Sequence, residues 1–147
     1  MGFKYKFEKL LTIKENEKDK VIGEYNVAVH NFEKAATKLY ELLKQKEDIQ
    51  AQQSMQLQIG LNIGRIQELQ RFLLVHENVI NLCQTEVAQA RRMMEMKEQL
   101  LLEKNIEVKK YEKIKEKNWD AYCQFERAEE NKLMDEISIQ QYMNRGN

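Results

Sequence analysis

The chain contains no proline in its 147 residues, and its apolar residues recur at alternating intervals of three and four. Proline and clustered glycine are the residues that most often end helices and mark loops, so this chain offers few places for a helix to stop. The 3-4 spacing runs from Val21 to Ile49 and again from Ile66 to Tyr111, as is typical of helices that each carry one apolar seam. The pattern predicts two long helices.

The segment between these stretches carries Ser54, Gly60 and many glutamines, and Asn62 is suited to cap a following helix. We therefore predict an all-α fold, a single domain over residues 1–147 that forms a long antiparallel two-helix coiled-coil hairpin. Helix 1 is expected over about residues 4–52, the tip over about 53–62 and helix 2 over about 63–143. Helix 2 is the longer, so its C-terminal part should overhang.

The two seams match in size when the helices are folded back on each other. Ala35 then faces Cys83 and Ala28 faces Ala90, so that small layers alternate with large ones. Farther from the tip, Lys14 faces Lys104 in the seam. Because charged groups are costly to bury, we expect that segment to be wet and mobile.

Charge and hydropathy exclude several classes of function. The 24 basic residues balance the 24 acidic ones, so no net field attracts nucleic acid or acidic lipid. No apolar run approaches the roughly 20 residues that span a bilayer, and the amino terminus lacks a signal-peptide core. We expect a cytoplasmic protein with no nucleic-acid partner and no direct membrane insertion. Cys83 and Cys123 lack neighbouring ligands, which indicates reduced thiols and no metal site.

Catalysis finds little support in the sequence. His76 falls on the seam and His30 on the outer face, and neither lies in a pattern that implies a nucleophile or a proton relay. Gly60 and Gly64 lack the Lys-Ser/Thr of a phosphate-binding loop. A two-helix hairpin also forms few pockets, so we expect no enzymatic activity and no cofactor.

The predicted overhang keeps large apolar residues beyond Tyr111, where helix 1 has ended. They are Ile114, Trp119, Tyr122, Phe125, Leu133, Met134, Ile137, Ile139 and Tyr142. Either a dimer or a folded-back terminus covers these residues, or they insert into another protein.

A second apolar feature lies beside the seam. Helix 2 carries Phe72, Val79, Met93 and Leu100, which are separated by seven residues or, between Val79 and Met93, by two such intervals. The facing positions of helix 1 are polar and include Lys38 and Gln45. The ridge should remain at least partly exposed, and exposed ridges of this kind usually dock a partner.

Four segments, read in their order along the chain, resemble the FliJ family of flagellar export proteins. They are Phe3–Leu11, Gln70–Phe72, Glu103–Lys113 and Met134–Ile139, and the resemblance covers essentially the whole chain. It implies an antiparallel coiled coil similar to the central stalk of rotary ATP synthases. It further implies insertion into the hexameric export ATPase FliI, contact with the cytoplasmic part of the export gate protein FlhA, and a link to export chaperones.

The resemblance also implies where partners bind. Family members carry a gate-docking patch near the middle of the hairpin, and here Leu42 and Phe72 match its apolar members while His76, Val79 and Cys83 depart from its pattern. Together with the polar neighbours of the ridge, the expected gate-docking set is Lys38, Leu42, Gln45, Phe72, His76, Val79 and Cys83.

Both ends of the chain are expected to enter the ATPase ring. The expected ring-insertion set is Phe3, Tyr5, Phe7, Trp119, Tyr122, Phe125, Met134 and Ile137. Such a stalk would be peripheral at the inner face of the cell membrane, with the export apparatus. The alternative is an export chaperone or coiled-coil adaptor without ring insertion, and one chain per six ATPase subunits would distinguish the stalk.

Overall fold

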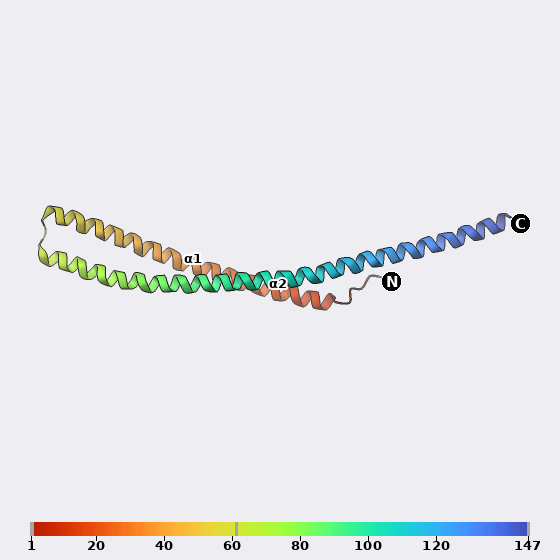
Figure 1. Cartoon of the computed structure of the whole chain (residues 1–147), viewed down its shortest axis with the longest axis horizontal. Coiled ribbons are helices and arrows are strands. Elements are labelled where there is room, and N and C mark those ends of the chain that lie inside the picture. Colours follow the sequence, from red (N-terminus) through yellow and green to blue (C-terminus); the bar gives the residue numbers. More distant parts are fainter. Residues whose placement is uncertain (1, 61, 147) are drawn as a thin grey trace. The chain divides into compact units, whose positions relative to one another are not determined.

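The computed structural model describes residues 2–60 and 62–146, which form two helices and no strand. The helices are α1 (Glu8–Ile59) and α2 (Ile63–Arg145), and they pack against each other, which confirms the predicted all-α hairpin (Figure 1). The chain divides into two compact units. We call Lys20–Leu102 the tip unit, and Met1–Asp19 with Glu103–Asn147 the terminal unit.

The helix ends differ from the predicted ones mainly at the tip. α1 continues to Ile59, so the tip predicted over residues 53–62 is wrong in its first seven positions. Glutamine, methionine and leucine are good helix formers, and the helix stops only where Gly60 adopts a positive φ of 83°. The Oδ1 atom of Asn62 accepts a hydrogen bond from the backbone N–H of Gly64 at 3.2 Å, which confirms the predicted N-cap of α2.

The amino terminus also differs, because α1 begins at Glu8 rather than near residue 4. The N–H of Glu8 donates to the carbonyl of Tyr5 at 3.2 Å, closing a turn that precedes the helix. Residues 2–5 form no regular structure. The aromatic residues of this segment pack on α2 instead of continuing the helix.

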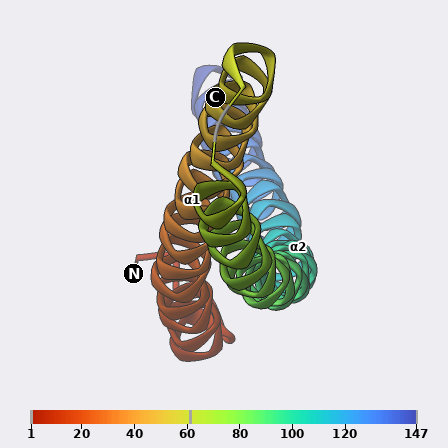
Figure 2. The ribbon, with the colours of Figure 1, turned by 90° about the vertical axis from the view of Figure 1, so that its left-hand side faces the viewer.

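In the tip unit, α1 and α2 lie side by side (Figure 2). The Sγ atom of Cys83 lies 3.9 Å from the carbonyl oxygen of Ala35, the layer predicted from the spacing. Ala28 is buried as well, and Ile80 and Cys83 are each only 2% exposed. A seam one side chain deep therefore holds this unit together.

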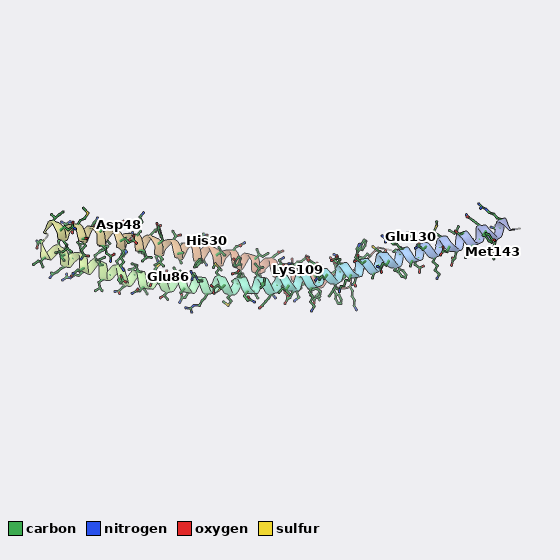
Figure 3. All side chains as sticks on the ribbon, turned by 45° about the horizontal axis from the view of Figure 1, so that its top comes forward. His30, Asp48, Glu86, Lys109, Glu130 and Met143 are labelled. Carbon is green, nitrogen blue, oxygen red and sulfur yellow. The ribbon has the colours of Figure 1, made fainter. Side chains whose placement is uncertain are left out.

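The terminal unit has its own small core. Tyr5, Leu11 and Val108 are buried in it, with Tyr111 and Ile114 packed against them. After Cys123 every described residue of α2 is exposed, so the predicted C-terminal overhang is present. Figure 3 labels Glu130 and Met143 on this stretch, which the α1 stretch of the terminal unit does not reach.

The seam lysines of the terminal unit are ion-paired, which the sequence argument did not foresee. Lys14 lies 3.4 Å from Glu107 and 3.5 Å from Glu17, and Lys104 lies 3.3 Å from Glu17. The hydrogen bond to Glu107 raises the pKa of Lys14, and the hydrogen bond from Lys104 lowers the pKa of Glu17. The lysine side chains are each 25% exposed, so the layer is partly wet as expected, but shared carboxylates neutralise it.

Candidate functional surfaces

The expected gate-docking set is divided between the surface and the seam of the tip unit. Phe72 and Val79 on α2 are exposed, as are Lys38 and Gln45 on α1, whereas Leu42 is half-buried. Phe72 is 55% exposed and stacks on the ring of His76 with centroids 5.9 Å apart. These exposed side chains form a surface of the kind that the ridge predicted.

His76 and Cys83 lie inside the seam rather than on that surface. His76 is 7% exposed, and its Nε2 atom lies 2.7 Å from the carbonyl oxygen of Leu42, so the nitrogen donates to this acceptor. Carbonyls of α1 thus accept hydrogen bonds from the Nε2 atom of His76 and from the Sγ atom of Cys83. His76 and Cys83 therefore lie behind the exposed members of the gate-docking set, and the ring of His76 stacks on that of Phe72.

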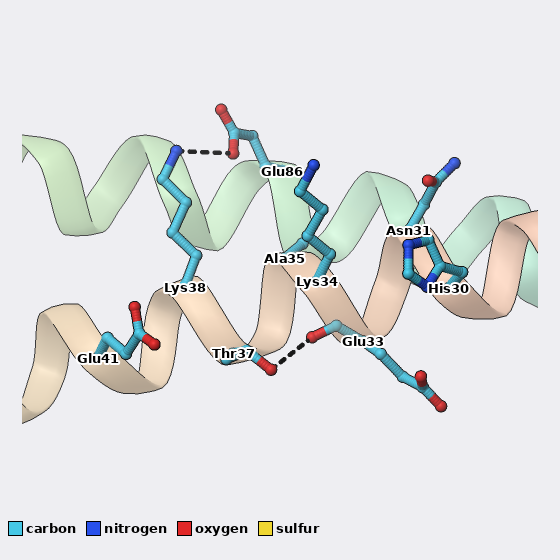
Figure 4. A pocket seen from close by; sticks show the side chains of 9 residues that line it. All are labelled: His30, Asn31, Glu33, Lys34, Ala35, Thr37, Lys38, Glu41 and Glu86. Atoms are coloured by element: carbon cyan, nitrogen blue, oxygen red, sulfur yellow. Dashed lines mark hydrogen bonds and ion pairs between the residues drawn. The ribbon is translucent and has the colours of Figure 1, made fainter.

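A groove beside the ridge is lined mainly by α1. Its walls include His30, Asn31, Lys34 and Lys38, with Glu86 contributed by α2 (Figure 4). The Nζ atom of Lys38 lies 3.8 Å from a carboxylate oxygen of Glu86, with both side chains more than half exposed. Such an exposed pair contributes little to stability, about 1 kcal/mol or less.

The expected ring-insertion set is also divided. Phe3 meets Trp119 edge to face at 5.2 Å and Tyr122 at 5.5 Å, so the amino terminus partly covers both residues. Tyr5 is buried, and its hydroxyl donates to the carbonyl oxygen of Tyr111 at 2.9 Å. For Trp119 and Tyr122, the amino terminus therefore provides part of the cover, as in the predicted alternative of a folded-back terminus.

Burial raises the pKa of two tyrosines of this aromatic cluster, Tyr5 and Tyr122. It raises the pKa of Tyr5, with a further contribution from Glu8, because a phenolate would be poorly solvated there. It also raises the pKa of Tyr122, aided by Glu126. A phenol is already neutral at physiological pH at its ordinary pKa of about 10, and the upward shift acts in the same direction.

The remaining members of the ring-insertion set are uncovered. Phe125, Met134 and Ile137 are exposed on the overhang, and sequence reasoning missed Met143, which is exposed beside them. Phe7 is exposed at the margin of the aromatic cluster, 5.9 Å from Tyr5 between ring centroids. The stretch of α2 on which every described residue is exposed begins after Cys123.

Among residues 2–60 and 62–146, no group of three or more histidine, cysteine or acidic side chains is placed to hold a metal ion. Neither described helix is long and apolar enough to cross a membrane. The exposed surfaces of the tip unit and of the overhang offer apolar and charged contacts to macromolecules.

Comparison with known proteins finds similarity over nearly the whole chain. The family model described as "Flagellar FliJ protein" matches residues 3–147. The "Flagellar FliJ protein" of Bacillus subtilis (strain 168) is 40% identical over 146 residues, covering 99% of each chain. No solved structure matches. The chain belongs to the FliJ family and is a component of flagellar protein export.

Proposed function

We propose that this protein is the stalk of the flagellar export ATPase, with the end of α2 inserted into the FliI hexamer and the tip unit docked on the cytoplasmic part of FlhA. The observation that supports this proposal is the exposure of apolar side chains on the overhang. Seven large apolar side chains are exposed after Cys123, namely Phe125, Leu133, Met134, Ile137, Ile139, Tyr142 and Met143. Family membership names the machinery in which such a surface would work.

The overhang is a single helix with an exposed apolar surface, so a partner that surrounds it would stabilise it. An isolated helix is only marginally stable in water, and most helical stability in proteins comes from packing of an apolar face. Each large apolar side chain contributes about 1.5–3 kcal/mol when it is fully buried. A ring that encloses the overhang would therefore stabilise both the helix and the assembled hexamer, because a ligand favours the state that it binds more tightly.

The ridge on the tip unit is the proposed gate contact. Phe72 is an exposed aromatic side chain supported from behind by His76, which is the arrangement expected of an anchor in an interface. Phe72→Ala is expected to weaken binding to the FlhA domain by about 2 kcal/mol while leaving helicity unchanged. Calorimetric titration of the variant, beside its circular dichroism spectrum, measures both quantities.

Ring insertion is tested by making the overhang polar without shortening it. Leu133→Gln combined with Ile137→Gln removes two exposed apolar groups but keeps good helix formers. We expect this double variant to lose stimulation of FliI hydrolysis and of hexamer formation. Val27→Gln combined with Leu74→Gln removes equally exposed groups from the tip unit and serves as the matched control. Full stimulation by the overhang variant would contradict ring insertion.

Such a stalk would work in the cytoplasm at the inner face of the cell membrane, where the export apparatus receives its substrates. Its part is mechanical and allosteric rather than catalytic. Binding to export chaperones is compatible with the same exposed surfaces. If the overhang variant retained FliI stimulation but lost chaperone binding, a chaperone or adaptor without ring insertion would be the better description.

A further inference from the structure

α2 carries a second apolar stripe that is separate from the seam packed on α1. Its members recur at alternating intervals of three and four, and they are Phe72, Val75, Val79, Leu82, Glu86, Gln89, Met93, Met96 and Leu100. Each member precedes a seam position by one residue, which places the stripe about 100° around the helix from the seam. It extends over about four heptads, a length typical of coiled-coil pairing, and lies within the tip unit.

The second stripe is open to a partner along its length. Six of its apolar side chains are exposed, including Leu82 at 68%, and Leu100 is half-buried. α1 leaves this side of α2 uncovered, since the groove of Figure 4 reaches the stripe at Glu86. A second groove, lined by Gly23, Val27 and Met93, reaches it farther along. There is therefore room for another helix against α2.

From Val75 to Leu100, the order of residues in the second stripe is complementary to itself. A stripe with alternating three- and four-residue intervals contains two kinds of core position, a and d. When two such stripes run antiparallel, each a position faces a d position of the other helix. A two-fold axis between Val87 and Ala88 pairs Leu82 with Met93, Val79 with Met96 and Val75 with Leu100 of the second copy. The same axis pairs the two polar members, Glu86 with Gln89, so that an amide donates to a carboxylate. We propose that the second stripe binds a second copy of this chain in this antiparallel arrangement.

The charges along the second stripe favour a second copy of this chain as the partner, and they favour the antiparallel direction. In a parallel pair, Glu86 would meet Glu86 of the second copy, and like charges directly opposed are destabilising. In the antiparallel pair, Glu86 meets Gln89, and Lys38 of its own chain lies 3.8 Å from its carboxylate. At the flanks Arg92 faces Thr85 of the second copy, so that no like charges oppose there. Two-fold symmetry makes every favourable layer occur twice.

The dimer would share residues with the gate contact. Phe72 and Val79 belong both to the second stripe and to the gate-docking set, so, on the proposed function, the gate and the second copy compete for one surface. Leu82 lies outside the gate-docking set. A change there tests the dimer alone, and its outcome leaves the assignment of the gate contact untouched.

Sedimentation equilibrium of the full chain tests the interface. We expect a concentration-dependent dimer whose dissociation constant rises at least about 100-fold in Leu82→Lys, because the change places two charges in one interface. Leu74→Lys is the matched control, since Leu74 is 66% exposed but lies outside both stripes. A chain that is monomeric at every accessible concentration, or a dimer that Leu82→Lys leaves intact, would overturn the proposal.

Cross-linking tests the direction of the pair. Leu82→Cys and Met93→Cys are placed in separate, differently tagged chains that also carry Cys83→Ala and Cys123→Ala. In the antiparallel register their Cβ atoms come within about 4 Å, so mild oxidation should join the two kinds of chain to each other. Joining of each kind only to itself would indicate a parallel pair and refute the proposed register.

Discussion

Truncation of Ile80 to alanine should destabilise the hairpin, since Ile80 is 2% exposed and lies in the seam between His76 and Cys83. Isoleucine-to-alanine changes in protein cores cost about 2–5 kcal/mol, from lost burial and the cavity left behind. This seam is one side chain deep, so the helices can close part of the gap, and alanine regains a few tenths of a kcal/mol in helix propensity. We therefore expect a loss of about 2 kcal/mol in the free energy of unfolding.

Urea unfolding followed by circular dichroism measures this loss, at a concentration where the chain is monomeric. The matched control is Leu74→Ala, which removes a 66% exposed side chain from the same helix and should change stability by less than about 0.5 kcal/mol. The urea dependence should stay the same in both variants, because the same surface is exposed on unfolding. If Ile80→Ala is no less stable than Leu74→Ala, the seam does not hold the helices together.

Two further predictions concern the terminal unit. Phe3→Ala removes the ring that meets Trp119, the only tryptophan, at 5.2 Å, so the emission of Trp119 should shift to longer wavelength while helicity is unchanged; an unshifted spectrum would contradict the packing. Lys104 holds the pKa of Glu17 below its usual value, so this pair stabilises the fold above the carboxyl pKa of the unfolded chain, about 4.3, and the stabilisation is lost as pH falls through the lower folded pKa. The stability difference between wild type and Glu17→Gln should therefore shrink in urea titrations at decreasing pH, and a difference independent of pH would refute this coupling.

Much of the fold follows from the spacing of apolar residues. The 3-4 series needs only the periodicity of a helix, and size matching between two such series fixes their register, as the contact between Cys83 and Ala35 confirms. The cap at Asn62 was also predictable, because its side chain acts on the backbone two residues away. The register of the helices and the cap at Asn62 were predictable because they depend on the geometry of a helix and on one kind of contact that repeats along the seam.

The amino terminus and the charged layer depend on information that a helical repeat does not contain. Residues 2–5 are not helical, and a chain in extended form covers about 3.3 Å per residue, against about 1.5 Å in a helix. Phe3 therefore reaches Trp119, farther along α2 than helical counting allows. Allowing for an extended amino terminus would have found this contact.

The charged layer arises from side chains outside the seam. Glu17 and Glu107 reach in from neighbouring positions to pair with Lys14 and Lys104, which a layer-by-layer comparison of seam residues does not consider.

The division of the gate-docking set between surface and seam has a similar origin. Spacing places His76 on the seam, but only the structure shows that its Nε2 atom meets the carbonyl of Leu42.

The stoichiometry of the complex with FliI tests the central claim most directly. A chain enclosed by a ring through its single overhang can be present once per hexamer, whereas an adaptor that binds each ATPase subunit separately has no such limit. Native mass spectrometry gives the ratio when the complex is assembled with an excess of the Leu82→Lys variant, so that dimers of this chain do not add to the count. We predict one chain per six FliI subunits, and one chain on every FliI subunit would contradict the stalk.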